Sequence, residues 1–315
     1  MSYLFGNVKE YKMEEFDENM ERIFLLGFEE SHIYENTTAT KLAEHGKFLF
    51  RKGLNRKEKY NEEDILIRYG VDSYPSFDKF FGVILNRATC IRANLNKLKT
   101  ALLLNNHGIN TPRIYLRKDN IETFPVLRRR RNHSRGKDII FIENSIALKN
   151  VSGDFFSQFL ESDREYKCHV FRNECIRLSL KVPNDEGLSV NNIVRSYDNG
   201  WRLSDIYTHS PREERKAINE SIKAVKYLGL DFGCTDVLID KSGKVWILEV
   251  NTCPRLNRFG REIYTRTFYD FLNIPLPEDI SMGLVKEWEH HKDIPIVYRH
   301  VYSSKEQKAT MFKGL

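Results

Sequence analysis

The sequence predicts an α+β protein built from several lobes. Its first part alternates short apolar strands with an amphipathic helix, its later parts place strands next to one another, and one hairpin carries two acidic residues. Elements that partly alternate and partly segregate are typical of α+β proteins. A chain of 315 residues can hold two or three lobes around a sizeable core.

The first part of the chain, residues 1–112, is expected to form an N-terminal α/β domain. The stretch "DILIRYG" at 64–70 predicts a short strand, and "NLNKLKTALLLNNHGINTP" at 94–112 predicts a helix with leucines at helical spacing. Gly108 suits the left-handed position after a helix, and Pro112 blocks its continuation.

Two further lobes and a tail are expected to follow. Residues 113–190 contain the strands "FPVLRR" and "DIIFIEN" and a later strand pair, and are interpreted as a second lobe. Residues 191–290 contain an amphipathic helix at 211–230 and the acidic hairpin at 234–254. Residues 291–315 form a basic tail.

The hairpin "CTDVLIDKSGKVWILEVNTCP" places two acids where they would repel each other. A turn symmetric about Ser242 and Gly243 pairs Asp236 with Glu249, and Asn251 points to the same face as Glu249. Such a cluster of oxygen ligands suits Mg²⁺, especially when substrate phosphates complete its coordination. The alternative is that both acids turn into solvent at the end of the hairpin.

Residues 128–137 form a basic loop between two predicted strands. The loop is a solvated charge run, a nucleic-acid patch, or a lid over polyphosphate in which Gly136 lets backbone N–H groups approach the oxygens. Strand alternation separates Arg128 from Arg129, so only one of them can face a ligand. The position of the loop upstream of the predicted Mg²⁺ cluster favours a nucleoside triphosphate.

Composition narrows the class of protein. The chain is 41% hydrophobic and 30% charged, which indicates a globular protein. No apolar run reaches membrane-spanning length and no signal-peptide profile is present, so we expect a cytoplasmic protein without a membrane partner. The five cysteines form no CxxC pair and are expected to be free thiols. The net charge of +6 suits phosphate-bearing partners but is too modest to require nucleic acid as a partner.

Together these patterns resemble the ATP-grasp superfamily of carboxylate–amine ligases over roughly residues 64–270. The resemblance rests on Asp236, Glu249 and Asn251 in "EVNTCP", on "NK…GINTP", on "FPVLRR" and on "QFLESDREYKCHVF". D-alanine–D-alanine ligases and ribosomal-protein glutamate ligases share the hairpin pattern, and the blocks are most similar to ATP-grasp proteins of tailed bacteriophages. The resemblance implies an N-terminal pre-ATP-grasp lobe, two α+β lobes that clasp ATP, and a bacterial or phage-infected host cytoplasm.

The resemblance also implies site residues. Asp236, Glu249 and Asn251 would hold Mg²⁺, with Mn²⁺ as an alternative. The residues implied to bind ATP come from the lid strand, the phosphate loop, the adenine hinge and the strand after it: Arg129, His133, Ser134, Gly136, Lys137, Gln158, Phe159, Leu160, Glu165 and Lys167.

The implied reaction is ATP-dependent joining of a carboxylate to an amine through an acyl-phosphate, releasing ADP and phosphate, with a peptide or protein as one option for the substrate. Lys181 is a candidate for the phosphate or acyl-phosphate oxygens. Arg195 is a candidate ligand of the carboxylate or the acyl-phosphate, and the alternative is a surface arginine on a turn. Arg68 is a candidate carboxylate-binding residue. Cys234 and Arg255 depart from the family pattern on the acceptor side, so no acceptor follows from the resemblance.

Two alternatives remain at this stage. A kinase on the same scaffold would keep the phosphoryl group on its product. A nucleic-acid-binding protein using residues 128–137 would bind DNA or RNA without ATP and with a steep salt dependence.

Overall fold

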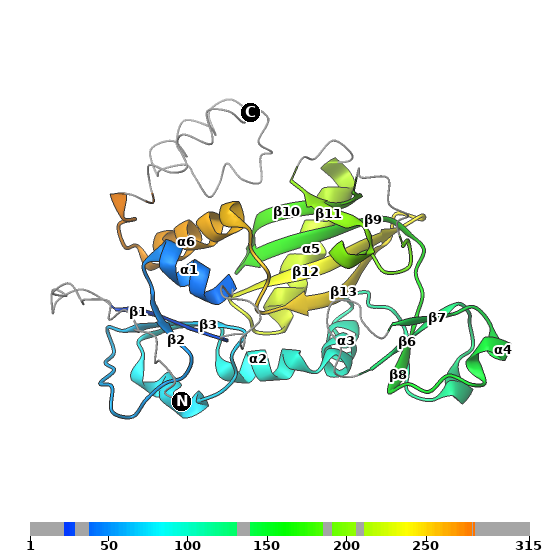
Figure 1. Cartoon of the computed structure of the whole chain (residues 1–315), viewed down its shortest axis with the longest axis horizontal. Coiled ribbons are helices and arrows are strands. Elements are labelled where there is room, and N and C mark those ends of the chain that lie inside the picture. Colours follow the sequence, from blue (N-terminus) through cyan, green and yellow to red (C-terminus); the bar gives the residue numbers. More distant parts are fainter. Residues whose placement is uncertain are drawn as a thin grey trace, which may run out of the picture.

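The computed structural model describes residues 22–28, 38–130, 139–184, 191–205, 211–278 and 280. These residues form three β-sheets with helices packed around them (Figure 1). Figure 1 shows the first lobe and the five-stranded sheet lying against each other, while the small four-stranded sheet of β5 to β8 stands apart at one end. Within the described residues no helix combines the length and apolar character needed to cross a membrane.

The first lobe is a parallel sheet with the strand order β2-β1-β3-β4. Its strands are β1 (Ile23–Gly27), β2 (Leu49–Arg51), β3 (Ile65–Tyr69) and β4 (Val83–Leu85), and its helices are α1 (Thr38–Gly46), the 3-10 turn η1 (Pro75–Phe80), α2 (Ala88–Leu95) and α3 (Lys97–Asn106). The helix α1 connects β1 to β2 and the turn η1 connects β3 to β4, so helical and strand segments alternate as the sequence predicts. The α/β character expected for this region is therefore confirmed for its described residues.

The predicted helix at 94–112 is in fact the end of α2 followed by α3. Asn96 separates the two helices because its side chain accepts a hydrogen bond from the Lys99 N–H at 3.1 Å and so caps α3. Leu95 and Leu102 are about half exposed, at 53% and 47%, so the leucine spacing does not mark a buried stripe. Gly108 has the positive φ of 74° expected where a helix ends.

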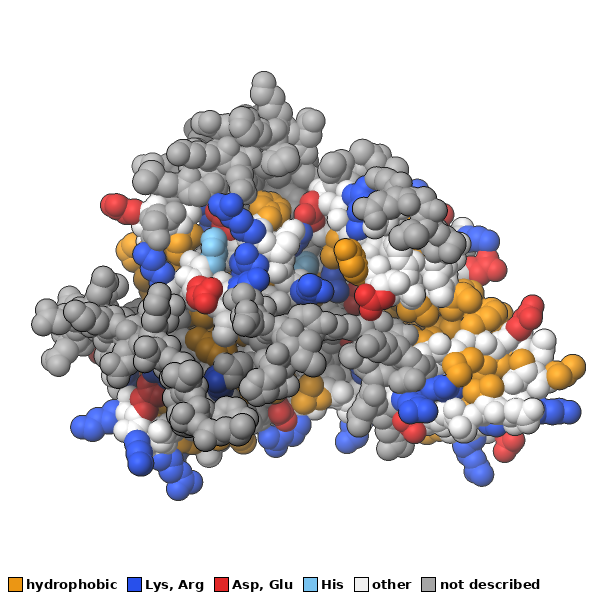
Figure 2. Space-filling view, in the orientation of Figure 1, with side chains coloured by type: hydrophobic (Ala, Val, Ile, Leu, Met, Phe, Trp, Pro, Cys, Tyr) orange, Lys and Arg blue, Asp and Glu red, His pale blue; other side chains and the backbone are white. Residues whose placement is uncertain are grey.

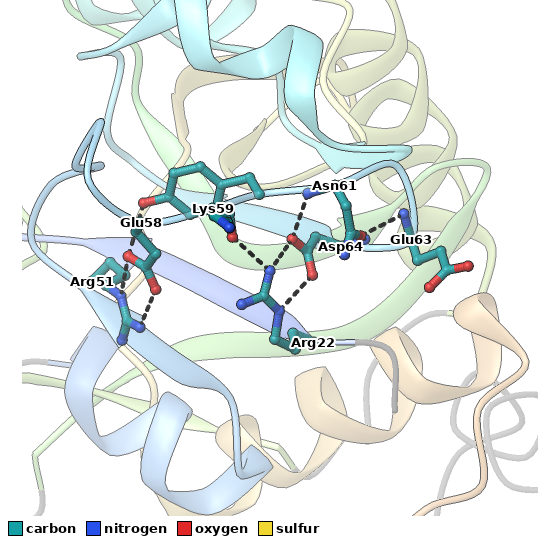
Figure 3. Close-up of polar contacts among 8 residues, drawn as sticks. Arg22, Arg51, Glu58, Lys59, Asn61, Glu63 and Asp64 are labelled. Atoms are coloured by element: carbon teal, nitrogen blue, oxygen red, sulfur yellow. Dashed lines mark hydrogen bonds and ion pairs between the residues drawn. The ribbon is translucent and has the colours of Figure 1, made fainter. Parts of the chain in front are cut away.

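Ion pairs fasten the loop between β2 and β3 to the first sheet (Figure 3). Arg22 forks onto Asp64 at 2.8 Å and 2.5 Å, and Arg51 pairs with Glu58 at 2.6 Å. The Asn61 N–H also donates to Asp64, at 2.8 Å. This network lies within the first lobe and holds the loop at 52–64 in place.

The second sheet is antiparallel, with the strand order β5-β8-β6-β7, and we call it the lid. It contains β5 (Ile114–Tyr115), η2 (Lys118–Asn120), β6 (Val126–Arg129), β7 (Ile140–Ile142), α4 (Ser145–Leu148) and β8 (Phe155–Gln158). Its small core consists only of lid residues, among them Tyr115, Val126 and Phe156.

The third sheet has the order β11-β10-β9-β12-β13 and is antiparallel throughout. It contains β9 (Ser162–Phe171), β10 (Glu174–Pro183), η3 (Tyr197–Asn199), β11 (Trp201–Ser204), β12 (Phe232–Asp240) and β13 (Val245–Asn251), with α5 (Pro211–Tyr227) and α6 (Arg258–Leu272) packed on it. The expected second lobe, 113–190, included β9 and β10. Their pairing with β12 moves the end of the lid to about residue 161.

The first lobe and the third sheet share one hydrophobic core. Leu25, Leu42 and Ile67 of the first lobe pack in the same cluster as Phe232 of β12 and Phe268 of α6. Because the lid contributes nothing to this cluster, the lid is the part of the described chain with the least packing against the rest.

A buried asparagine joins the same two lobes. Asn86 follows β4, has a φ of 62° and is fully buried. Its amide donates to the Phe232 carbonyl at 2.9 Å and accepts from the backbone N–H groups of Asp231 and Phe232, at 2.8 and 3.1 Å. The junction therefore uses both acceptor positions of the amide oxygen and one of its two N–H donors.

Candidate functional site

Strand alternation gives the third sheet one apolar and one charged face. Cys168, Leu178 and Val237 belong to a core that also contains Ala217 and Val225 of α5. The neighbouring residues along the strands point to the opposite face. They are Glu165 and Lys167 of β9, Ser179 and Lys181 of β10, and Asp236 of β12.

The two acids of the hairpin lie opposite each other, as the sequence predicts. Asp236 pairs with Glu249, but the turn itself pairs Ile239 with Val245 and Val237 with Ile247. That register would place Leu248 opposite Asp236. A β-bulge at Leu248 inserts one residue and brings Glu249 onto the charged face.

Two lysines surround the Asp236 carboxylate. Lys181 Nζ lies 3.4 Å and Lys167 Nζ lies 3.7 Å from Oδ1. Burial opposes ionisation of Asp236, but the charges of Lys167 and Lys181 prevail and lower its pKa to about 2. The Asp236 charge in turn raises the pKa of Lys167, and it raises the pKa of Lys181, together with Glu165, against the opposing effect of burial. Asp236, Lys167 and Lys181 are therefore charged at neutral pH.

Glu249 has a partner from a distant part of the chain. Lys97 Nζ, in the first turn of α3, lies 3.0 Å from Glu249 Oε2. Both side chains remain more than a quarter exposed, at 29% and 28%. Lys97 belongs to the "NK" of the segment that enters this region, but the sequence pattern predicts no role for it. The contact adds a cation to the candidate site.

The donor set fits a hard cation that is also held by phosphates. Asp236 Oδ1 is buried and makes no hydrogen bond, and Oδ2 accepts one from Asn251 Nδ2 at 3.2 Å. The part of the chain that the structure describes contains no cluster of three or more His, Cys, Asp or Glu residues suited to a metal. Two carboxylates and one amide oxygen are too few for a Mg²⁺ site of protein ligands alone but suffice when phosphate oxygens and water complete it.

The lid places one arginine toward this cluster. Arg128 is buried in the lid against Gly153, where a Cβ would lie 2.4 Å from the Arg128 Cγ. Arg129, the next residue of β6, has a buried Nε without a hydrogen bond. Burial lowers the pKa of Arg129, and the nearby Glu249 carboxylate opposes this. The expected phosphate-loop residues His133, Ser134, Gly136 and Lys137 lie outside the described residues.

The expected adenine hinge joins the lid to β9. The Gln158 N–H donates to the Arg113 carbonyl at 2.8 Å, and its side chain helps to line a hollow of about 370 Å³ with Arg113 and Trp246. The ring of Phe159 packs edge-on against Phe141 of β7 at 5.0 Å, and Leu160 is half-buried. Glu165, the expected ribose ligand, is buried and 2.9 Å from Lys181 Nζ. The Glu165 carboxylate therefore forms an ion pair with Lys181 and orients that side chain.

Both arginines that the sequence marks as catalytic candidates, Arg68 and Arg195, lie away from the Asp236 cluster. Arg68 is fully buried in the first lobe, where it forms an ion pair with Asp78 and donates to the carbonyls of Ser73 and Tyr74 at 2.7 and 3.0 Å. A guanidinium with these partners cannot bind a substrate carboxylate, so Arg68 is a structural residue. Arg195 donates to the Ser162 carbonyl at 3.1 Å and stacks over Trp201 at 4.4 Å, which puts it at the hinge end of β9.

The other end of the charged face is closed by α6. His169 of β9 is buried and hydrogen-bonds through Nδ1 to Tyr264 at 3.0 Å. Burial, helped by the positive charges of Arg177 and Lys167, holds the pKa of His169 well below its usual value, so the imidazole is neutral. Arg177 forks onto Asp205 and also donates to Asn257, the residue that caps α6, at 2.9 Å. His169 and Arg177, with the α6 residues that they contact, therefore border the charged face beyond Lys167.

The cysteines do not enter the site chemistry as disulfides. All five are free, as the sequence predicts, although Cys168 and Cys175 have their sulfur atoms 3.3 Å apart in the core. Cys234 is buried between His169 and Asn251, and burial raises its pKa beyond the physiological range. The thiol of Cys234 is therefore protonated and packs as a small residue.

Comparison with known proteins agrees with this architecture. No protein-family model and no curated protein sequence matches the chain. The D-alanine–D-alanine ligase of Bacillus anthracis complexed with ATP is 14% identical, with a TM-score of 0.57 over 85% of this chain and 99% of that one. The N5-carboxyaminoimidazole ribonucleotide synthetase of Thermotoga maritima is 15% identical, with a TM-score of 0.56 over 82% of this chain and 77% of that one.

The ATP-grasp ligase PsnB complexed with a minimal precursor is also similar in structure. It is 11% identical, with a TM-score of 0.53 over 76% of this chain and 93% of that one. Identities this low carry information about architecture alone. The similarity extends over most of each chain, and the chain has the ATP-grasp fold.

Proposed function

We propose that the protein is an ATP- and Mg²⁺-dependent ligase that joins a carboxylate to an amine. The observation that carries the proposal is the charged face of the third sheet, where Asp236 and Glu249 lie opposite each other and are surrounded by Lys167, Lys181 and Lys97. Solved structures similar to this chain include a D-alanine–D-alanine ligase complexed with ATP and the ATP-grasp ligase PsnB complexed with a minimal precursor, Mg and ADP. Both support a nucleotide substrate for the proposed reaction.

Asp236, Glu249 and the Asn251 amide oxygen would hold Mg²⁺, which would draw charge from the phosphate oxygens when bound. Asp236 is poised for this role because it is ionised far below neutral pH and has a buried oxygen without a hydrogen bond. Mn²⁺, which also accepts oxygen ligands, is an alternative metal. The lysines beside Asp236 balance the negative charge of the pair.

The cations would position the triphosphate. Arg129 from the lid, Lys97 from α3 and Lys167 from β9 approach the acidic pair from three sides, so each can neutralise a different phosphate oxygen. Lys181, held by Glu165, is the remaining candidate for a phosphate or acyl-phosphate oxygen. The hinge residues Gln158, Phe159 and Leu160 would border the adenine, and Glu165 the ribose.

The reaction would proceed in two displacements. A carboxylate oxygen of the substrate attacks the γ-phosphorus, the bond to the bridging oxygen breaks, and ADP leaves. The amine nitrogen then attacks the acyl carbon, the bond to the phosphate oxygen breaks, and phosphate leaves while the nitrogen loses a proton. The chain's own contribution is positioning and charge stabilisation. A peptide or protein is our preferred class of substrate.

The test is to measure ADP, free phosphate and product separately. The protein is incubated with Mg²⁺, ATP and pooled amino acids and peptides, and Asp236→Asn is compared with the exposed lid variant Asp119→Asn. We expect ADP release by the wild type and the Asp119 variant, loss of release in the Asp236 variant, and free phosphate only when an amine is present.

Two outcomes would contradict the proposal. Phosphate retained on the product would make the protein a kinase. Wild-type protein that binds no nucleotide in the presence of Mg²⁺ would reject the ATP site altogether.

A further inference from the structure

We propose that the amine substrate is a primary amine on an aliphatic chain, and that it binds on the β11 side of the charged face. This inference rests on the proposed function and specifies its second substrate. Asp205 would bind the ammonium group, and Leu203 would contact the methylene groups next to it. The sequence pattern predicts no role for either residue.

Matched strand positions connect Asp205 to the Asp236 cluster. Asp236 pairs with Lys167 of β9, and Lys167 pairs with Ser179 of β10. The Ser179 hydroxyl donates to Asp205 Oδ1 at 2.5 Å. Because neighbouring strands lie about 4.8 Å apart, Ser179 is two strand spacings, or about 10 Å, from Asp236 across the sheet. Asp205 is therefore within reach of a substrate molecule bound beside Asp236.

Leu203 brings an apolar side chain to the same face. It lies directly opposite Lys181 of β10, and residues opposite each other in a sheet share a face. Lys181 Nζ lies 3.4 Å from Asp236 Oδ1. Leu203 is 43% exposed. Single exposed leucines are common on protein surfaces, but this one is one strand away from a lysine of the candidate site. It also lies two residues before Asp205, about 7 Å along the strand.

Asp205 is held firmly and can still accept a hydrogen bond. Arg177 donates from Nε to Oδ1 at 3.1 Å and from Nη2 to Oδ2 at 2.7 Å. With the Ser179 hydroxyl, three of the roughly four acceptor positions of the carboxylate are used by described residues. The Asp205 side chain is 31% exposed and that of Arg177 only 5%. The accessible part of the pair is therefore the carboxylate, which suits a charged N–H donor.

The lysines and arginine nearby do not exclude an ammonium ion. The three cations around Ser179 are each paired with an acid: Arg177 with Asp205, Lys167 with Asp236, and Lys181 with Glu165. Figure 2 shows basic and acidic side chains next to one another near the middle of the face in view. A bound triphosphate would add negative charge to this balanced set, which favours a cationic second substrate.

Two other sides of the charged face are closed. Toward α6, His169 and Cys234 are buried. Toward the first lobe, the Tyr69 hydroxyl donates to the Pro254 carbonyl, so that lobe covers the loop after Asn251. The β11 side is therefore the direction in which we expect the amine to approach.

The test measures amine binding by saturation-transfer NMR on the full chain with Mg²⁺ and a non-hydrolysable ATP analogue. The probes are 1-aminopentane, 1-pentanol, which lacks the ammonium group, and ethylamine, which has a shorter apolar chain. The variants are Asp205→Asn and Leu203→Ser. The matched controls are Asp198→Asn in η3 and Leu116→Ser in the lid, both at exposed residues outside the strands of the charged face.

We expect the wild type to bind 1-aminopentane about 10-fold more tightly than 1-pentanol, because a hydrogen bond to a charged group is lost. We expect a preference of about 10-fold over ethylamine, because fewer methylene groups are buried. Asp205→Asn should remove the first preference and keep the second, Leu203→Ser should do the reverse, and both controls should keep both. Circular dichroism shows whether each variant is folded.

Equal binding of the amine and the alcohol by the wild type would overturn the inference, as would loss of either preference in a control. Leu203→Ser leaves the Arg177–Asp205 pair intact, so unchanged discrimination by this variant overturns the inference even if Asp205→Asn does not fold. Nucleotide binding is measured separately by calorimetry. Wild-type protein that binds nucleotide but shows neither preference refutes only this inference, whereas no nucleotide binding refutes the proposed function.

Discussion

Replacing Asp236 by asparagine tests the electrostatics of the site independently of any substrate. The substitution keeps the shape of the side chain but leaves Lys167 and Lys181 facing an amide. The pKa of Asp236 is about 2, against an ordinary value of 3.8, and each unit corresponds to about 1.4 kcal/mol. The ionised carboxylate therefore stabilises the folded protein by about 2 kcal/mol at pH 7.

The dependence of stability on pH determines how the difference between wild type and the Asn variant changes. A carboxylate whose pKa is lower in the folded than in the unfolded chain stabilises the fold above the unfolded pKa, and this contribution is lost as pH falls from about 4 to 2. The Asn variant does not titrate at this position. We expect it to be less stable than wild type by about 2 kcal/mol at pH 7 and by only about 1 kcal/mol at pH 3.

Equilibrium urea unfolding, followed by circular dichroism at both pH values, measures these differences. Glu161→Gln is the control, because the Glu161–Lys241 ion pair is well exposed on both sides and its loss is expected to leave the stability of the fold nearly unchanged. A variant as stable as wild type at pH 7, or a deficit of the same size at both pH values, would refute the reasoning. In that case the two lysines would not be stabilised by Asp236.

Two further predictions concern residues that the structure assigns to the framework. Two such residues are Arg68 and Asn86. Arg68→Met should lower the free energy of unfolding by about 3–5 kcal/mol, because it leaves Asp78 and buried carbonyls without their hydrogen-bond donor. Thermal denaturation measures this loss, and an unfolding temperature close to that of the wild type would make Arg68 a candidate for substrate binding again. Asn86→Ala should cost about 2–4 kcal/mol, because it removes the hydrogen bonds between β4 and the start of β12. Limited proteolysis should then cut the variant faster in the first lobe, and an unchanged cleavage rate would show that the shared core alone joins the lobes.

The acidic hairpin shows how much of the candidate site can be predicted from local sequence pattern. The spacing of Asp236, Glu249 and Asn251 is contained in one short stretch, so the facing pair was predictable without any tertiary information. The predicted turn was nevertheless displaced, and the pair arises because the bulge at Leu248 compensates for that displacement. A bulge depends on how both strands meet their neighbours, which the hairpin sequence does not specify.

Long-range contacts account for most of the features that local sequence patterns do not predict. Lys97 lies 152 residues from its partner Glu249, and no periodicity or composition signal connects the two. Arg68 stands at the end of a strand, as predicted, but the following loop wraps around its guanidinium. The lid boundary was displaced for the same reason, since β9 and β10 form a recognisable hairpin whose sheet partner, β12, lies far along the chain.

The sequence by itself determined the class of fold, the existence of the acidic hairpin and the alternation that gives the third sheet a charged face. These features depend on neighbours within a few residues, where backbone geometry dictates which side chains share a face. Only the tertiary structure decided which cations surround Asp236 and Glu249, which arginines are structural, and how the first lobe closes on the loop after Asn251. Such contacts are set by the packing of a shared core, because each lobe must bury its apolar surface against the other before its charged side chains acquire definite neighbours.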